Sequence, residues 1–466
     1  MSTNPTSLTL RPHILYQVAK AAWEGTLYQK SDELTALLQD EYKDKYTRKQ
    51  VANQIRSAMG LPPHDSDQIT GPNDEEALMG INYDPVWITD ADACSHCDPD
   101  DRACIAACAT KAITTDEQGR IQIDQDKCIG DGLCVTSCSF GALAENSQFV
   151  PLIKLLRESQ APVYASVAPA FAGQFGPEVT AGKLRSALKK IGFTDVVETA
   201  LYADLLTMKE ALEFHEHVKE KNDFLITSCC CPVWIKLIEN KFPELIDKIS
   251  PSVSPMIASG RVIKEFTPEA KVVFIGPCIA KKQEILIPEL QGAIDFVLTF
   301  QELKAIFDAA EVDPAKEEDH ENPQASWGGR VYGRTGGVSE AVATTVERLV
   351  PQRAQKLQSL KVDGIPEIQK LLEALKTSGA PEANFIEGMA CKGGCVGGPA
   401  RIIPPDAGTE YVNDYGNASH AKTPVENTQV YAILSRFGLQ EGTIPDLTTG
   451  ESAMSKLLSR TLSPKK

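Results

Sequence analysis

The distribution of cysteines is the feature that most constrains this chain. Of thirteen cysteines in 466 residues, seven lie between residues 94 and 138 and the other six are spread over 229–395. The N-terminal sequence has no export signal, and no apolar stretch is long enough to span a bilayer. We therefore expect a cytoplasmic protein. In that reducing compartment, clustered cysteines are more often metal ligands or redox groups than disulfides.

Charge limits the partners of the protein. Lys+Arg 47 against Asp+Glu 63 gives a net charge of −16 and a pI near 5.0. This balance argues against a nucleic-acid or membrane partner, because both surfaces are anionic, and it permits a basic protein partner.

The sequence pattern predicts four regions. Residues 11–60 have apolar positions at helical spacing and predict two or three helices. A stretch rich in Gly, Pro and Asp follows and looks like a linker that ends near residue 80. The predicted regions are a helical N-terminal region with its linker, a small cysteine-rich domain, a large domain and a C-terminal extension, at 1–80, 81–150, 151–400 and 401–466.

The large region alternates short apolar runs with amphipathic stretches. Runs such as 163–168 and 271–276 read as strands, and 203–219 and 338–350 read as helices. This alternation predicts an α/β domain with mostly parallel sheets. Residues 400–425 look irregular, and 426–437 predict one more helix before a tail rich in Ser, Thr and Lys.

The cysteine-rich segment repeats the spacing of bacterial two-cluster ferredoxins. That run is C-x2-C-x2-C-x3-C, written twice, and the last cysteine of each run ligates the other cluster. The first copy has a longer middle spacer, DPDDRA, and QGRIQIDQDKC supplies a hairpin between the copies. The crossover rule predicts one cubane held by Cys94, Cys97, Cys104 and Cys138. It predicts a second cluster surrounded by Cys128, Asp131, Cys134 and Cys108.

Asp131 stands where a fourth thiolate is expected. A carboxylate ligates iron more weakly than sulfur does, so the site would hold either a 4Fe-4S cluster with one oxygen ligand or a 3Fe-4S cluster. The alternative is a solvated loop aspartate beside an incomplete cluster.

Three further cysteine motifs follow in order. They are TSCCCPVW at 227–234, GPCIAKKQE at 276–284 and EGMACKGGC at 387–395. The first two follow strand-like runs, so their loops meet at strand ends, where α/β domains bind ligands. Together with FPEL at 242–245, Ser254-Pro255 and GRTGGV at 333–338, these motifs closely resemble the catalytic domain of FeFe (diiron) hydrogenases. The triple cysteine resembles a less-studied subgroup of that family.

The resemblance implies a fold, a cofactor and a ligand set. It implies two lobes with mostly parallel sheets around a buried cluster, beside a small α+β ferredoxin-like domain. The cofactor is the H-cluster, a 4Fe-4S cubane joined to a two-iron subcluster with CO, cyanide and azadithiolate. The family ligands correspond to Cys231, Cys278, Cys391 and Cys395. The residues that surround the diiron unit correspond to Lys281, Ala168, Pro169 and Met389.

The family also needs a proton exit. Cys230 matches its relay thiol, Glu210 and Glu213 match two relay glutamates, and Ser250 falls at a further relay position. The outermost family arginine is His217 here. Read without the resemblance, the glutamates would be a solvated helix face and Cys230 an inert buried thiol.

The register of the triple cysteine is open from the sequence. Alignment from Pro232 makes Cys231 the ligand and Cys230 the relay thiol. Alignment from Thr227 makes Cys230 the ligand and Cys229 the relay thiol.

The resemblance predicts a ferredoxin-linked hydrogenase that oxidises H2 or reduces protons. Its expected partners are ferredoxin or a similar one-electron carrier and the maturation proteins that install the diiron unit. The alternative is a hydrogenase-like iron-sulfur assembly protein without that unit. A hydrogen sensor would be expected to carry an added signalling domain. Residues 1–85 fit either a docking domain or a structural cap.

Overall fold

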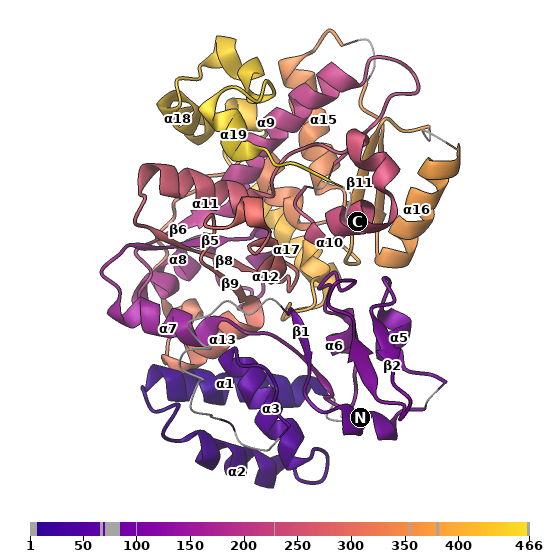
Figure 1. Cartoon of the computed structure of the whole chain (residues 1–466). Coiled ribbons are helices and arrows are strands. Elements are labelled where there is room, and N and C mark those ends of the chain that lie inside the picture. Colours follow the sequence, from indigo (N-terminus) through magenta and orange to yellow (C-terminus); the bar gives the residue numbers. More distant parts are fainter. Residues whose placement is uncertain are drawn as a thin grey trace.

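The structure is a computed structural model of the chain (Figure 1). It describes residues 7–65, 69, 84–98, 100–227, 229–353, 356–378 and 382–463. The predicted linker end near residue 80 and Ser228 of the TSCCCPVW motif lie outside these residues. Within them, no helix is both long and apolar enough to cross a membrane.

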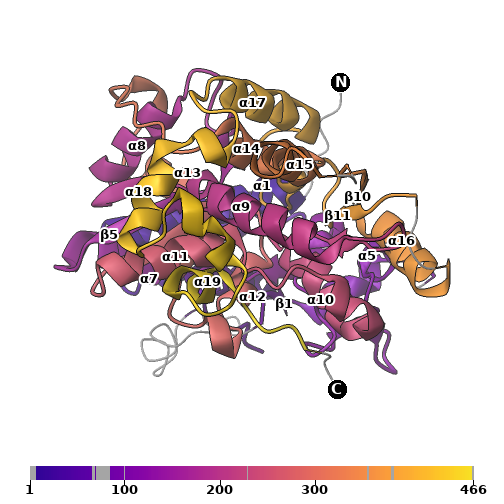
Figure 2. The same ribbon diagram turned by 90° about the horizontal axis from the view of Figure 1, so that it is seen from above.

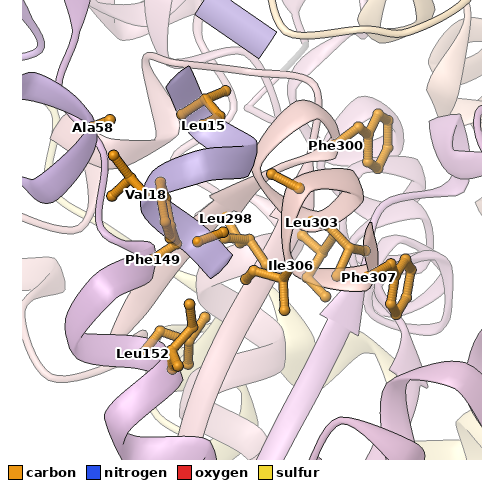
Figure 3. Packing of buried hydrophobic residues seen from close by; sticks show 14 of the residues in the cluster. Leu15, Val18, Ala58, Phe149, Leu152, Leu298, Phe300, Leu303, Ile306 and Phe307 are labelled. Carbon is orange, nitrogen blue, oxygen red and sulfur yellow. The ribbon is translucent and has the colours of Figure 1, made fainter. Parts of the chain in front are cut away.

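Three helices form the N-terminal region, as the sequence predicted: α1 (Ser7–Trp23), α2 (Ser31–Tyr42) and α3 (Arg48–Met59). Thr47 and Gln50 form a capping box that starts α3, and Gly60 ends it with a positive φ of 87°. Helix α1 packs against α7 (Phe149–Glu158) and α13 (Phe300–Ala309). Figure 3 shows Leu15 and Val18 of α1 in this contact. The N-terminal helices thereby join one core with the large domain.

The cysteine-rich module has two antiparallel strand pairs. Strand β1 (Val86–Ile88) pairs with β4 (Leu143–Glu145), and β2 (Ile113–Thr115) pairs with β3 (Ile121–Ile123) as the predicted hairpin. The short helices α5 (Ala103–Ala107) and α6 (Leu133–Ser137) carry the ends of the two cysteine runs. Arg11 of α1 ties the module to the N-terminal region through Glu145, with Nε to Oε1 at 2.9 Å.

The larger lobe is built on a four-stranded parallel sheet in the order β6-β5-β8-β9. The strands are β5 (Val163–Val167), β6 (Asp195–Glu198), β8 (Lys271–Gly276) and β9 (Phe296–Thr299). Three helices that pack on this sheet are α8 (Ala181–Lys190), α11 (Pro255–Phe266) and the short α12 (Lys281–Glu284). The predicted strands at 163–168 and 271–276 are confirmed.

The second lobe has a three-stranded parallel sheet in the order β10-β11-β7. Its strands are β7 (Leu225–Ile226), β10 (Ser359–Asp363) and β11 (Phe385–Met389), with helices α10 (Pro232–Lys241) and α16 (Ile365–Ser378). Helix α9 (Thr199–His217) packs against α11, α14 (Trp327–Arg330) and α15 (Gly337–Leu349). Figure 2 shows α9 crossing the middle of the molecule. The predicted α/β class with parallel sheets is confirmed.

The C-terminal region differs from the prediction of an irregular segment at 400–425. Helix α17 spans Pro405–Asn417, because Pro405 suits the first turn and two glycines permit close packing. A Cβ at Gly408 would lie 3.0 Å from Val396, and one at Gly416 would lie 3.0 Å from Val331. Helix α18 (Thr428–Arg436) follows as predicted. The predicted tail contains a further helix, α19 (Ala453–Leu458).

Candidate functional site

Four cysteines from three loops meet between the two lobes, each just after a strand end. Cys231 is the N-cap of α10, Cys278 follows β8, and Cys391 and Cys395 follow β11. Each has some uncovered surface, and none is in a disulfide. We call these residues the catalytic set. The structure therefore brings together the four cysteines expected from the resemblance.

The electrostatics of the catalytic set suit metal binding. The pKa of Cys278 is raised to about 11 and that of Cys395 to about 12, mainly by burial and in part by neighbouring thiols of the set. Bound iron would lower these pKa values, because cysteine binds a metal as the thiolate. In the described part of the chain, no three His, Cys, Asp or Glu side chains are close enough to hold a single ion.

Glycines shape the loop between Cys391 and Cys395. Gly393 and Gly394 have φ values of 81° and 87°, which favour glycine. A Cβ at Gly394 would lie 2.5 Å from the backbone nitrogen of Thr335, in the GRTGGV segment. Glu387 fixes the same segment by accepting hydrogen bonds from the backbone N–H groups of Gly336 and Ser339 at 2.7 and 2.8 Å. The two motifs therefore form one structural unit.

Lys281 is a buried cation beside the catalytic set. Its Nζ donates to Oε2 of Glu284 at 2.6 Å, and the residue is 6% exposed. Burial lowers the pKa of Lys281, but the carboxylate of Glu284 and the thiols of Cys278 and Cys230 offset this, so its pKa is raised overall. The ammonium is thus kept charged where an anionic ligand of a cluster would find a donor.

The other residues expected around the diiron unit are also buried between the lobes. Ala168 and Pro169 follow β5, and the backbone N–H of Ala168 donates to the carbonyl of Ile275 at 2.8 Å. Met389 ends β11, is 1% exposed and packs in the same cluster of buried residues as Cys230.

The triple cysteine places its thiols in three different environments. Cys231 faces the catalytic set, as the alignment from Pro232 expects. Cys230 is 8% exposed and lies near Cys395 and Lys281. Cys229 lies against the carboxyl of Glu210. The geometry therefore favours Cys231 as the ligand and adds Cys229 to the residues near the glutamate.

Glu210 is fully buried on α9 rather than on a solvated helix face. Its Oε2 accepts a hydrogen bond from the Thr227 hydroxyl, and its Oε1 has no hydrogen-bond partner in the described part of the chain. The pKa of Glu210 is raised to about 7, mainly by burial and in part by the nearby Glu213 carboxylate. A carboxyl with this pKa exchanges protons near neutral pH.

One turn along α9, Glu213 is buried in a polar network. Its Oε2 accepts from Ser250 Oγ at 2.6 Å, which joins two residues expected in the proton exit. Sequence reasoning missed Lys209, whose Nζ pairs with Glu213 and donates to Ser252 Oγ at 2.9 Å. His217, in the last turn of α9, is exposed. Glu210 and Glu213 are thus followed along the helix by an exposed histidine.

Tyr332 is a second residue that sequence reasoning missed. Burial raises its pKa well above 10, and the charges of Glu210, Cys229 and Cys230 add to this effect. Its hydroxyl is hydrogen-bonded to Thr207 Oγ1 at 2.8 Å. Its position directly before the GRTGGV motif was the available signal.

The module gathers its ligand candidates in the predicted crossed pairing. We call one group the outer set, which is Cys94, Cys97, Cys104 and Cys138. We call the other the inner set, which is Cys108, Cys128, Asp131 and Cys134. Burial and the other three thiols of the outer set together raise the pKa of Cys104 to about 11. Burial is also the main cause that raises the pKa of Cys134, and the other members of the inner set add to it.

The inner set is the one that faces the large domain. A Cβ at Gly132 would lie 2.6 Å from Ile279 and 3.2 Å from Pro399, residues that flank Cys278 and Cys395. The Asp131 charge also raises the pKa of Cys391, after burial and the neighbouring thiols. Asp131 itself is half-buried, its partial burial raises its pKa to about 6, and its Oδ1 accepts from the Leu133 N–H at 2.9 Å. The inner set therefore lies between the outer set and the catalytic set.

The comparisons with known proteins identify the family. Residues 161–399 match the model of the iron only hydrogenase large subunit, C-terminal domain, and residues 93–142 match the 4Fe-4S dicluster domain. The chain therefore belongs to the iron-only hydrogenase family, as the cysteine motifs predicted.

Curated relatives include both enzymes and assembly factors. The NADP-reducing hydrogenase subunit HndD of Solidesulfovibrio fructosivorans is 29% identical over 58% of this chain and 55% of its own length. The periplasmic Fe hydrogenase large subunit of Nitratidesulfovibrio vulgaris is 30% identical over 61% of this chain and 87% of its own length. Cytosolic iron-sulfur assembly component 3 of Bos taurus is 25% identical over 62% and 73%. The chain thus spans about half the length of HndD.

A solved structure has the same fold. A variant of the FeFe-hydrogenase HydA1 from Chlamydomonas reinhardtii superposes with a TM-score of 0.55 at 22% identity, covering 68% of this chain and 99% of that chain.

Proposed function

We propose that this chain is an FeFe hydrogenase that catalyses reversible H2 oxidation and proton reduction at an H-cluster. It would exchange electrons with ferredoxin or a similar one-electron carrier. The observation that carries this proposal is the series of buried acid–base side chains beside the catalytic set. A protein that only assembles or carries a cubane has no proton to move and no need of this series.

The residues around the catalytic set have distinct roles in this proposal. The H-cluster, held by Cys231, Cys278, Cys391 and Cys395, would supply the metal site at which H2 is formed or split. Lys281 would donate to an anionic ligand of the diiron unit, and Glu284 keeps its ammonium charged. The loop of Ala168 and Pro169 and the side chain of Met389 would enclose the unit and exclude water.

The proton route would begin at Cys230 and continue through Glu210, Ser250 and Glu213. Cys230 lies beside Cys395 and Lys281, so its thiol would meet the proton first. Glu210 accepts or returns the proton near neutral pH. Ser250 would connect to Glu213 through the existing hydrogen bond. The exposed His217 would release the proton to solvent.

Electrons would enter through the two sets of the module. The outer set would hold a 4Fe-4S cluster and receive the electron from the carrier. The inner set would pass it to the catalytic cubane, because Gly132 and Asp131 lie against the loops that hold that cubane.

We propose that Asp131 ligates the fourth iron of the inner cluster. Its half-buried position among three cysteines supports this, since a carboxylate that is partly removed from water is stabilised by a positive partner. Anaerobically prepared wild type should then show no electron paramagnetic signal of an oxidised three-iron cluster. Asp131→Ala should show that signal, and Asp131→Cys should not. Equal signals from wild type and Asp131→Ala would show that the carboxylate does not hold the iron.

The second candidate function is iron-sulfur assembly, which relatives such as the Bos taurus component favour. The two functions differ after loading by diiron-site maturation proteins. The enzyme should then evolve hydrogen from a strong reductant. A chain that keeps its cubanes but takes up no diiron unit and evolves no gas under these conditions would favour the assembly function.

A further inference from the structure

Arg102 is a buried cation without a visible counter-charge. It lies in the lengthened DPDDRA spacer, directly before α5, and is 7% exposed. Its Nε and Nη1 have no hydrogen-bond partner among the residues that the structure describes. In the same residues no carboxylate forms an ion pair with it, although Asp98, Asp100 and Asp101 are close in sequence. Such an arrangement is costly, because buried charges are normally paired.

The guanidinium lies beside the outer set. Burial raises the pKa of Cys94 and of Cys97, and the positive charge of Arg102 opposes this rise in both thiols. On its other side, the β2–β3 hairpin covers the group, since a Cβ at Gly119 would lie 3.7 Å from Nη2. Arg102 is therefore enclosed between two cysteines of the outer set and a hairpin turn.

Arginine cannot release its charge, so an anion must balance it. Thiolates and an iron-sulfur cluster in the outer set would supply that anion. We propose that Arg102 is the counter-charge of the outer cluster and raises its reduction potential. This inference rests on the proposed ligands of the outer set and does not depend on hydrogen chemistry.

The direction of the effect follows from charge balance. One-electron reduction takes an electron from the carrier or from dithionite and adds one negative charge to the cluster. A buried cation stabilises the reduced form more than the oxidised form, because low local polarity strengthens the attraction. Removal of the cation should make the outer cluster harder to reduce and leave the inner cluster unchanged.

The test is a redox titration of the full chain with its iron-sulfur clusters but without the diiron unit, followed by electron paramagnetic resonance. In Arg102→Gln, the reduction equilibrium constant of one module cluster should fall at least tenfold, which is about 59 mV for one electron. Arg102→Lys retains the charge and should stay within a factor of about three of wild type. Arg120→Gln is the matched control, because Arg120 is an exposed arginine on the β2–β3 hairpin, paired with Asp116 at 2.9 Å. It should change neither potential.

Unchanged potentials in Arg102→Gln, with both module clusters present, would overturn the proposal. If Arg102→Gln loses the outer cluster, iron content and the Arg102→Lys variant decide. A retained cluster at the wild-type potential in Arg102→Lys supports a counter-charge. Loss of the cluster in Arg102→Lys as well would mean that shape, not charge, is required. Absence of module clusters from the wild type would instead refute the ligand assignment of the proposed function.

Discussion

Cys230→Ala is expected to lower hydrogen turnover by about 10²–10⁴-fold while the protein keeps its catalytic cubane, the usual cost of removing a proton-transfer group. The reason is its position: the thiol lies near Cys395 and Lys281, at the inner end of the proton route. Turnover of the fully loaded variant tests the expected loss of activity. Iron and sulfide contents of the same sample test whether the catalytic cubane is retained.

Cys231→Ala is the contrasting variant. It should lose the catalytic cubane, because Cys231 faces the other three cysteines of the catalytic set. Loss of the cubane in Cys230→Ala and its retention in Cys231→Ala would reverse the register. Full turnover in a loaded Cys230→Ala would remove the thiol from the route.

Glu210→Gln should lower turnover by a similar factor of about 10²–10⁴, since an amide cannot accept and return a proton. The wild type should also depend on pH in opposite ways for the two directions. The pKa of Glu210 is raised to about 7, mainly by burial, so the carboxyl is mostly protonated below pH 7 and ionised above it. Proton reduction needs the protonated donor and should fall as pH rises through 7. H2 oxidation needs the ionised acceptor and should fall as pH decreases through 7.

The groups that face this carboxyl are Thr227, Cys229, Glu213, Lys209 and Tyr332. Glu216→Gln is the matched control, because Glu216 lies on the same helix but is exposed and contacts only Thr448 among the hydrogen bonds of the described residues. It should leave both profiles unchanged. Profiles in Glu210→Gln that match the wild type in height and shape would contradict a proton-transfer role.

Much of the fold could be predicted because the residues that determine it are close in sequence. The strand at 271–276 is a continuous apolar run, and the structure has β8 at Lys271–Gly276. The crossed pairing in the module was expected from the crossover rule of two-cluster ferredoxins, which the cysteine spacing resembles. Helix α17 could not be predicted, because its glycines and proline read as a loop and its helical form depends on packing against Val396 and Val331.

The candidate site was predictable in its cysteines, its glutamates and the buried Lys281, but not in two further buried cations. Lys209 and Arg102 occur among charged neighbours in the sequence, where a solvated surface is the usual reading. Only the three-dimensional structure shows that Lys209 pairs with Glu213 and that Arg102 lies beside Cys94 and Cys97. Tyr332 was missed although it directly precedes the GRTGGV motif, because its burial beside thiols depends on packing between distant segments.

The central claim is that the catalytic set seats a complete H-cluster. Infrared spectroscopy of the chain after loading with the diiron cofactor tests it most directly, because CO and cyanide bound to iron absorb where protein does not. The account predicts bands from both ligands, and their loss in Cys395→Ala. A clean spectral window from loaded wild type that still contains its cubanes would contradict it.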